Sequence, residues 1–566
     1  MIIELLSNII KETFNELNYE TTNLRVIKSN RPDLCDFQCD EAFKLAKSYH
    51  KNPIEIGEQI TEHLNKRPDF NEYFKEIEFV KPGFINIKLS DKFINKYLKE
   101  MNENIKSLLR VASKPETFVI DFGGANVAKP LHVGHMRTIM VGESIQRTIQ
   151  FMGHKTIGDV HLGDYGLQIG QVIYGVLRDK LKDEDINVLY LEKIYPEMSG
   201  ICKEDEKIKE DCAEITKKLQ EGNELYHRLW RRIVEVSVAD IKKNYDFLGA
   251  NFDYWYGESD SYDYLSKVED KFNQKGILKE SRGAYIVEVQ TEEDKKEIPP
   301  LLFKKSNGAY LYASTDLGTI EQRIEDFNPD HILYVVDSRQ SLHFEQVFRS
   351  SEMGGLIPKS ALEHLGYGTV NGEDGKPYKT RNGDNPKLEG LFEQTRQLFI
   401  SKKESNKDMS LEDVNKIANA ILKFADLQNC REKDYIFDLN KFSDVSGKTG
   451  PYILYTYLRI NKILKEEGME NVLTDCIYNK YDRDLRLKML DYPTAVETAF
   501  ETRMPHYIAE YVYNLCVACN IFYQNNHING MEDETNKKDW LYILALSNKI
   551  IKEMLNLLAI EIPSVM

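Results

Sequence analysis

Long apolar runs are missing from this sequence. None of its stretches approaches the ~20 apolar residues that a membrane-spanning helix needs. The first residues, MIIELLSNIIKETFNEL, have no basic segment ahead of the apolar positions, so they predict an amphipathic helix and not a signal peptide. We therefore expect a cytoplasmic chain with no membrane partner.

Cysteine is scarce and scattered, with 8 residues among 566. Cys35/Cys39 and Cys516/Cys519 are the only close pairs, and neither is completed by a second pair at zinc-site spacing. This distribution is typical of buried reduced thiols in the cytosol, so no protein-bound zinc is expected. The sequence also has no internal repeat and no low-complexity tract.

A positive net charge is missing as well. The chain has 75 lysines and arginines against 91 aspartates and glutamates, a formal net charge of −16 with a pI near 5.4. This balance argues against nonspecific binding of polyanions. A local basic patch can still bind one, because binding depends on the local field and not on the sum of charges.

Strands and helices alternate in the middle of the chain. Residues 117–120 (TFVI) and 331–336 (HILYVV) are β-rich apolar runs, which predict strands buried on both faces. A helix is predicted from about His132 to Phe151, and the next strand over 155–160. These elements indicate a βαβ start to a mostly parallel sheet.

The rest of the chain is mainly helical in pattern. Residues 1 to about 78 predict helices with one extended stretch, and Pro82-Gly83 predicts a turn before a strand-like run. We expect a linking helix over Ser90–Leu109, a charged helical insertion near 178–247, and helices from about Lys407 onward.

The predicted fold class is α/β, with three domains. An α+β domain is expected over residues 1–112 and an all-α domain over 441–566. Between them, a Rossmann-like domain with a parallel sheet is expected over 113–440.

The first predicted strand leads into Asp121-Phe-Gly-Gly-Ala-Asn-Val-Ala-Lys-Pro-Leu-His-Val-Gly-His135. Ligands of open parallel sheets bind beyond the carboxyl ends of strands, and a helix N-terminus offers free N–H groups to phosphate. His132 and His135 share one face of a first helical turn, so both can donate to a polyphosphate. Gly134 leaves room for a flat adenine against the backbone. A zinc pair, or two histidines satisfied within the fold, is the alternative, because HxxH alone is weak evidence.

This segment is similar to the HIGH motif of class I aminoacyl-tRNA synthetases, and its surroundings resemble the arginyl-tRNA synthetase family. The resemblance continues through His161-Leu-Gly-Asp-Tyr-Gly-Leu-Gln168 and to the final IEIPSVM, and covers essentially the whole chain. It implies an ATP-dependent arginine–tRNA ligase that uses L-arginine, Mg²⁺ and tRNA(Arg) and is a monomer. The last domain then corresponds to the family's anticodon-binding domain. Further matching stretches are Glu224–Ser259, Tyr310–Asp316, Tyr334–His343 and Gly450–Arg459.

The resemblance also implies which residues hold arginine. Asp121 and Asn126 match the residues that hold the amino acid, and Gln340 matches the glutamine of the later strand–loop. Tyr312 and Asp316 match the pair that contacts the guanidinium. The chemistry is suitable, because a guanidinium presents a planar fork of donors that calls for carboxylate and amide oxygens. Taken singly, each of these residues could instead be a helix cap or satisfy loop backbone.

The second signature of the class, KMSKS, is not intact. The matching stretch is Gly375-Lys-Pro-Tyr-Lys-Thr-Arg-Asn-Gly383, in which Lys379 and Arg381 flank the position of the second lysine. In the family a lysine ahead of the HIGH motif is thought to compensate, and Lys129 matches it. Lys129, Lys376, Lys379 and Arg381 are therefore alternative phosphate contacts. A solvated basic hairpin is the plain alternative.

Contacts with tRNA are implied at both ends of the chain. Phe84 and Asn86 match the aromatic and amide residues that contact the tRNA D-loop. Tyr452, Tyr455 and Arg459 lie at i, i+3 and i+7, so they share a helix face that could stack on anticodon bases, and Met566 matches the family's terminal methionine. Core packing is the alternative for these aromatic residues.

Two other functions fit parts of the sequence. A small-molecule nucleotidyl or adenylate-forming ligase can carry the same HxGH motif, but such enzymes are shorter and lack domains like 1–112 and 441–566. An inactive paralogue that only binds tRNA is the second, and the intact Asp121, His132 and Asp316 argue against it.

Overall fold

The computed structural model describes residues 2–306, 308–378, 387–402, 408–468 and 472–566. Its contacts group the chain into two compact units. Unit 1 comprises Met1–Val111, Tyr455–Thr498 and Glu510–Met554, and unit 2 comprises Ala112–Leu454, Ala499–Ala509 and Leu555–Met566.

Unit 2 is built on a parallel sheet with strand order β11-β10-β5-β6. The predicted strands and helix are confirmed within one or two residues. The register places Tyr334, Asp121 and Asp159 side by side at the carboxyl ends of β10, β5 and β6. The elements are β5 (Thr117–Asp121), α6 (Val133–Phe151), β6 (Lys155–Asp159), β10 (His331–Tyr334) and β11 (Leu362–His364).

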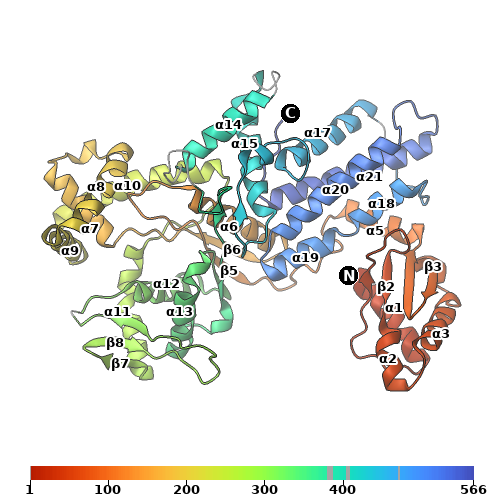
Figure 1. Cartoon of the computed structure of the whole chain (residues 1–566), viewed down its shortest axis with the longest axis horizontal. Coiled ribbons are helices and arrows are strands. Elements are labelled where there is room, and N and C mark those ends of the chain that lie inside the picture. Colours follow the sequence, from red (N-terminus) through yellow and green to blue (C-terminus); the bar gives the residue numbers. More distant parts are fainter. Residues whose placement is uncertain (1, 307, 379–386, 403–407, 469–471) are drawn as a thin grey trace. The chain divides into compact units, whose positions relative to one another are not determined.

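A group of helices follows β6 and includes the charged stretch near 178–247, which the sequence predicted to be helical. In Figure 1 they form one cluster in yellow. Short polar side chains cap the N-termini of three of these helices: Asn187 caps α8, Asp205 caps α9 and Asn223 caps α10. The helices are α7 (Leu167–Arg178), α8 (Val188–Glu204), α9 (Glu206–Gln220) and α10 (Glu224–Phe247), with the 3₁₀ turn η1 (Asp183–Asp185) before α8.

After α10, the chain forms further helices and strands and rejoins the parallel sheet at β10. An apolar core packs α11, α12 and α13 against β5 and β10, with Val119, Leu317 and Ile332 fully buried in it. The elements are α11 (Glu258–Lys275), β7 (Leu278–Ser281), β8 (Ala284–Val287), β9 (Leu301–Lys304), α12 (Tyr312–Phe327), η2 (Ser338–Gln340), α13 (Ser341–Gly354) and η3 (Lys359–Ala361). Strands β7, β8 and β9 form a small antiparallel sheet.

Most of the described chain beyond β11 is helical, which agrees with the prediction of helices from about Lys407 onward. One exception is the short parallel pair of β12 (Val370–Asn371) and β13 (Tyr435–Ile436). The helices are α14 (Leu388–Lys402), α15 (Leu411–Leu427), α16 (Leu439–Phe442), α17 (Gly450–Glu467), α18 (Lys480–Met489), α19 (Tyr492–Thr502), α20 (His506–Asn525) and α21 (Glu534–Leu557).

The segment Leu555–Met566 belongs to unit 2 and is tied to it by polar contacts. Ser144 Oγ of α6 donates to Leu557 O at 2.8 Å, and Lys423 Nζ of α15 donates to Ala559 O. Ser564 donates from its backbone N and its hydroxyl to the Asp413 carboxylate, at 2.6 and 2.8 Å. Burial lowers the pKa of Lys423 to about 7.

Unit 1 contains an antiparallel sheet of order β1-β2-β4-β3. The predicted turn at Pro82-Gly83 joins β3 to β4, as expected. The predicted linking helix is shorter than expected, because Asn104 adopts an extended conformation and ends α5 there. The elements are α1 (Ile2–Glu16), β1 (Ile27–Lys28), β2 (Phe37–Cys39), α2 (Glu41–Tyr49), α3 (Pro53–Asn65), α4 (Phe70–Tyr73), β3 (Phe74–Val80), β4 (Phe84–Leu89) and α5 (Asp91–Glu103).

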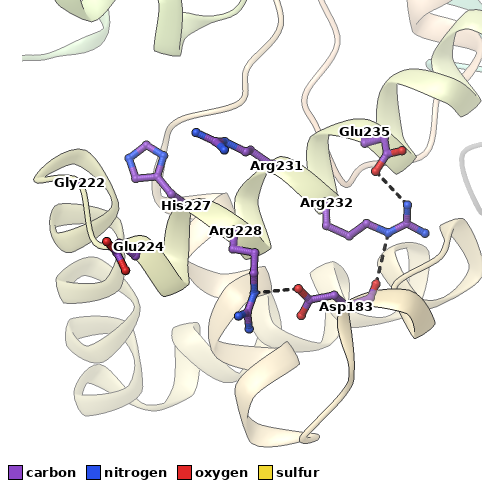
Figure 2. Close-up of a pocket in the computed structure, with 8 residues that line it drawn as sticks. All are labelled: Asp183, Gly222, Glu224, His227, Arg228, Arg231, Arg232 and Glu235. Carbon is purple, nitrogen blue, oxygen red and sulfur yellow. Dashed lines mark hydrogen bonds and ion pairs between the residues drawn. The ribbon is translucent and has the colours of Figure 1, made fainter.

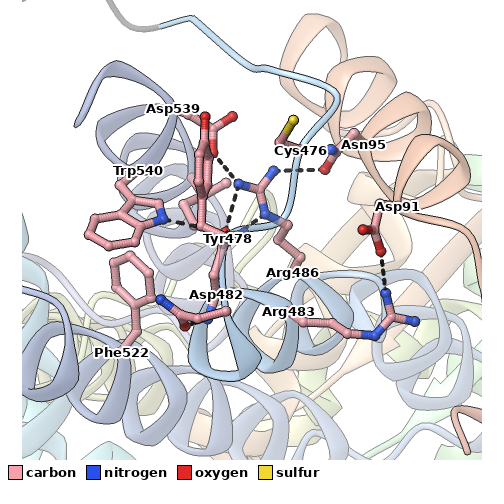
Figure 3. Close-up of polar contacts among 12 residues, drawn as sticks. Asp91, Asn95, Cys476, Tyr478, Asp482, Arg483, Arg486, Phe522, Asp539 and Trp540 are labelled. Carbon is pink, nitrogen blue, oxygen red and sulfur yellow. Dashed lines mark hydrogen bonds and ion pairs between the residues drawn. The ribbon is translucent and has the colours of Figure 1, made fainter. Parts of the chain in front are cut away.

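A buried arginine joins the helices of unit 1. Arg486 of α18 donates through Nε to Asp482 at 2.6 Å and through Nη1 to Asn95 of α5 at 2.7 Å, and it also pairs with Asp539 of α21 (Figure 3). The side chains of Arg486, Asp482 and Asp539 are all fully buried. No helix in the described part of the chain is long and apolar enough to cross a bilayer.

We expect Arg486→Met to lower the free energy of unfolding by about 3–5 kcal/mol, because it leaves buried carboxylates without their cation. Lys480→Ala on the same helix is the control: Lys480 is 72% exposed and pairs with Asp484, so its loss should cost less than about 1 kcal/mol. Urea unfolding of both variants checks this. Equal shifts would contradict the importance of the network.

Candidate nucleotide and amino-acid site

The two histidines of the motif cap the start of α6. His132 is the N-cap residue, and its Nδ1 accepts a hydrogen bond from Gly134 N at 3.1 Å. His135 Nδ1 accepts one from His132 N, also at 3.1 Å. The two rings lie 4.1 Å apart, centroid to centroid. Each imidazole therefore uses one nitrogen to satisfy a backbone N–H that the helix leaves free.

These bonds set the protonation of both rings. An accepting Nδ1 carries no hydrogen, so the neutral ring carries its hydrogen on Nε2. Burial lowers the pKa of His132, and it lowers that of His135 to about 4, with the nearby His132 adding to the effect. Near neutral pH the pair consequently offers two uncharged Nε2–H donors.

Gly134 is required by the cap itself. A Cβ at this position would lie 2.8 Å from His132 Cε1 and 2.9 Å from its Nδ1. Any side chain there would push the His132 ring out of its capping position. The approach of an adenine, which the sequence suggested as the reason for this glycine, stays a prediction.

A cavity of about 470 Å³ opens at the start of α6. It is lined by both histidines and Gly134, together with Gln340 from the end of η2, and its far wall is the segment 367–370. Buried Arg137 of α6 holds that wall by donating to Gly368 O at 2.7 Å and pairs with Asp426 at 3.1 Å. The cavity thus combines the two imidazoles at the start of α6 with the amide of Gln340.

A second group of site residues lies at the carboxyl end of β5. The charges of Asp316, Glu258 and Asp121 all raise the pKa of the Tyr312 phenol, with Asp316 contributing most. Tyr312 and Asp316 lie one turn apart on α12, and His343 Nε2 lies 2.5 Å from Asp316 Oδ2. The negative charges that act on Tyr312 at the start of α12 favour the binding of a cation.

Glu258 is a member of this group that the sequence reasoning did not assign. It is the first residue of α11, and burial raises its pKa to about 7. Asp164 fixes the start of this helix by accepting from Ser259 N at 3.0 Å and from Ser259 Oγ at 2.7 Å. The sequence signal was an acidic residue directly after Gly257, within a stretch already recognised as matching the family.

Asn126 and Lys129, two predicted site residues near the motif, contact other segments of the chain. Asn126 is exposed and forms a β-bridge with Gly163. A Cβ added at Gly163 would lie 2.3 Å from Asn126 Oδ1. Lys129 Nζ lies 4.7 Å from the ring centroid of Tyr195 in α8. Lys129 is also absent from the residues that line the cavity at α6. Cation–π packing against the insertion therefore occupies Lys129 in this state.

The predicted second phosphate loop is only partly described. Lys379 and Arg381 lie outside the described residues. Pro377 and Tyr378, just before them, line the same cavity as the two histidines. Lys376 is exposed in the turn that precedes them.

The predicted tRNA contacts of the first domain are unequally exposed. Asn86 is 6% exposed, and its Oδ1 accepts from Gln38 Nε2 at 2.8 Å. Phe84 is half-buried and packs edge-on against Phe43, with centroids 5.1 Å apart. Phe84 is thus the more accessible of the two.

The predicted tRNA contacts near the end of the chain are also unequally exposed. Tyr455 is 44% exposed, whereas Tyr452 is half-buried. The Arg459 guanidinium lies 4.3 Å from the ring centroid of Tyr523. Met566 is half-buried.

Another hollow, of about 590 Å³, lies on α10 of the insertion (Figure 2). Arg228 pairs with Asp183 at 2.8 Å, and Arg232 pairs with Glu235 at 2.9 Å. Figure 2 shows Arg231 and His227 on the side away from Asp183. Its three arginines are matched by three carboxylates, those of Asp183, Glu224 and Glu235, so it lacks the net positive charge that a phosphate site requires.

Comparison with known families gives matches along the chain. The model "tRNA synthetases class I (R), catalytic domain" matches residues 99–439, more than half of the chain. "Arginyl tRNA synthetase N terminal domain" matches residues 1–89, and "DALR anticodon binding domain" matches residues 453–566.

Named relatives agree over their full length. The arginine–tRNA ligases of Agathobacter rectalis and Alkaliphilus oremlandii are each 39% identical to this chain, over 99% of both sequences for the first and 100% for the second. The arginyl-tRNA synthetase structure from Plasmodium falciparum has a TM-score of 0.83 at 26% identity and covers 100% of this chain and 99% of its own. That of Thermus thermophilus covers 100% of both chains, with a TM-score of 0.81 at 22% identity, and shares the fold.

The parallel sheet, the capped start of α6 and the catalytic-domain match define a class I aminoacyl-tRNA synthetase. With the full-length relatives beside them, the chain belongs to the arginyl-tRNA synthetase family.

The neutral state of His135 makes the start of α6 sensitive to pH. Because its folded pKa, about 4, lies below the usual value of 6.5, its contribution to stability is complete above pH 6.5 and is lost as the pH falls toward 4. Relative to His135→Asn, whose side-chain oxygen can accept the same bond without titrating, the wild type should lose up to about 3 kcal/mol over this interval. Urea unfolding at several pH values measures the difference. Parallel curves for the two proteins would contradict the capping role.

Proposed function

We propose that this chain joins L-arginine to the 3′ end of its cognate tRNA(Arg), with ATP as the second substrate and AMP and pyrophosphate as products. The observation that carries the proposal is the pairing of two unlike subsites on one loop. Asp121 begins this loop, and its charge acts on Tyr312 together with those of Asp316 and Glu258; His132 ends the loop at the cavity that both imidazoles line. A cationic amino acid and an anionic nucleotide fit these two neighbours.

The first reaction step needs positioning more than proton transfer. The carboxylate of arginine is ionised at neutral pH, so it can attack the α-phosphorus of ATP without a general base. The Nε2–H groups of His132 and His135 are placed to follow charge onto the phosphoryl oxygens and the leaving pyrophosphate. Gln340, on the same cavity, is placed to fix the amino acid between the two subsites.

Selection of arginine follows from the acidic pocket. Tyr312, Asp316 and Glu258 present oxygens to a planar guanidinium, while Asp121 and Asn126 hold the α-amino end. The raised pKa of Glu258 means that an entering cation also favours its ionisation. Lysine has one point charge and cannot occupy all of these oxygens, so it would leave carboxylates unpaired.

Mg²⁺ enters the proposal through the nucleotide. The described residues contain no group of three or more His, Cys, Asp or Glu placed to hold a metal ion. We therefore propose that Mg²⁺ is bound by phosphate oxygens of ATP, where it would neutralise part of their charge.

The tRNA partner is proposed to contact both units. The exposed Tyr455 and the half-buried Phe84 offer aromatic faces for stacking on unpaired bases, and the further proposed contacts are Asn86, Tyr452, Arg459 and Met566. The second step is then transfer of the arginyl group to the 2′-hydroxyl of the terminal ribose. We propose a cytoplasmic, monomeric enzyme with the domain limits 1–112, 113–440 and 441–566.

Pyrophosphate exchange tests the reaction directly. Wild-type protein should incorporate labelled pyrophosphate into ATP only with arginine present, and far faster with tRNA(Arg) added, because the family generally needs tRNA for activation. Lysine in place of arginine is the control. Absence of exchange under every condition, with tRNA still bound, would favour the inactive paralogue.

Asp316→Asn tests the guanidinium pocket. It should raise the KM for arginine roughly 100-fold, because a charge-assisted bond in a partly desolvated pocket is lost, and leave the KM for ATP within about twofold. Asp326→Asn on the same helix, where Asp326 accepts from Tyr256 Oη at 3.2 Å, is the matched control and should change neither. An equal rise of both KM values in Asp316→Asn would show that the pocket is misassigned.

A further inference from the structure

Arg323 is a fully buried cation at the carboxyl edge of the sheet, and the mechanism above gives it no role. It projects from α12 to the ends of β5 and β6. Its Nη2 donates to Asp121 Oδ2 at 2.7 Å, and its Nε donates to Asp159 Oδ2 at 3.0 Å. The ring of Tyr334, at the end of β10, lies 5.3 Å from the guanidinium carbon. Arg323 therefore contacts the last residue of three adjacent strands.

The two carboxylates that Arg323 bridges are not equivalent. The side chain of Asp159 is fully buried, whereas that of Asp121 is 11% exposed. Asp159 is thus closed off from solvent and can only pair with Arg323. Asp121 gives Arg323 its Oδ2 and stays partly exposed, and its charge acts on the Tyr312 phenol. The single positive charge of Arg323 faces two carboxylates, so one negative charge is not balanced. A second cation bound at Asp121 would balance it.

Helix α12 provides a geometric link between the two ends of the proposed amino-acid pocket. Asp316 and Arg323 are seven residues apart, and Tyr312 is one turn before Asp316, so all three lie on one helix face. The same face thus supplies the proposed guanidinium ligands and the cation that holds Asp121. Their separation along the helix is fixed, because the backbone between them is continuous α-helix.

We propose that Arg323 is a positioning residue: it fixes one oxygen of Asp121 so that the other receives the α-ammonium group of the amino-acid substrate. Arg323 itself does not touch the substrate. It sets the distance between Asp121, which receives the α-ammonium group, and the residues that receive the guanidinium. The pocket therefore selects an amino acid by the length of its side chain. This inference rests on the proposed function, since it takes Asp121 as a ligand of arginine.

Arg323→Lys is the principal variant. It keeps the positive charge, but an ammonium group is a point donor and cannot hold two carboxylates in the fixed geometry of a guanidinium fork. The KM for arginine in tRNA-dependent pyrophosphate exchange should rise about tenfold or more, with the KM for ATP within about twofold. The matched control is Arg349→Lys, because Arg349 likewise bridges two carboxylates, those of Asp294 and Glu345, at 2.6 Å each. It should change neither KM value.

A second readout separates positioning from a general loss of structure. 5-Guanidinopentanoate is arginine without its α-amino group, so it cannot use Asp121 in the proposed way. As a competitive inhibitor against arginine, its Ki should stay within about twofold of the wild-type value in Arg323→Lys. The wild-type preference for arginine over this analogue should therefore shrink in the variant. Equal weakening of arginine and the analogue, or no change in either, would overturn the proposal.

Asp159→Asn covers the case in which Arg323→Lys fails to fold, judged by loss of its thermal transition. This substitution keeps the volume of the side chain but weakens the partner that seals Arg323, so the same split between arginine and the analogue is expected in smaller degree. An unchanged preference in Asp159→Asn would likewise overturn the proposal. Absence of arginine-dependent exchange in the wild type would instead mean that the proposed function fails.

Discussion

The contact of one buried guanidinium with two carboxylates at the ends of β5 and β6 governs the geometry of the acidic half of this site. Two acidic residues at the same level of a parallel sheet would repel each other and draw water into the sheet edge. Arg323 offsets both charges and packs under Tyr334, so the edge stays closed. Without this cation, Asp121 and Asp159 would lose their hydrogen bonds to α12 and would repel each other.

The two halves of the site use opposite electrostatic means within one loop. At its beginning, Asp121 adds to a field that favours cations. At its end, a helix N-terminus and two uncharged imidazoles favour anions without placing a fixed positive charge beside the proposed arginine pocket. Charged histidines would weaken the attraction of that proposed pocket for a cation. The lowered pKa values of His132 and His135 therefore suit both proposed substrates.

Much of this arrangement could be predicted from the sequence, for definite physical reasons. Strands buried on both faces form unbroken apolar runs, which located β5 and β10 closely. The start of α6 was found because a loop of small residues separates the end of β5 from the helical pattern. The linking helix was predicted too long because its helical pattern continues beyond Glu103, whereas the conformation of Asn104 ends it. The family resemblance supplied Asp121, Tyr312 and Asp316. Tyr312 and Asp316 lie one turn apart on α12, and Asp121 accepts a hydrogen bond from Arg323 of the same helix.

The remaining features depend on contacts between distant segments. Glu258 enters the pocket because Asp164 fixes the helix start that carries it, across about ninety residues of chain. Lys129 lies over Tyr195 because the insertion packs there, which a loop sequence alone does not encode. Gly134 is needed by the His132 ring, a requirement visible only once the cap is formed. Local patterns give elements and caps, whereas the direction of a side chain depends on its neighbours in space.

The contacts of residues 555–566 with unit 2 bear on how the chain is synthesised. Leu557, Ala559 and Ser564 contact α6 and α15, and the contacting residues of these helices are made 136 to 413 residues earlier. A ribosome holds the most recently made residues inside its exit tunnel, so these contacts form only after the whole catalytic sequence has emerged. The helix that carries the HIGH motif therefore acquires its full set of partners late, and a nascent chain does not have the packing of the finished synthetase.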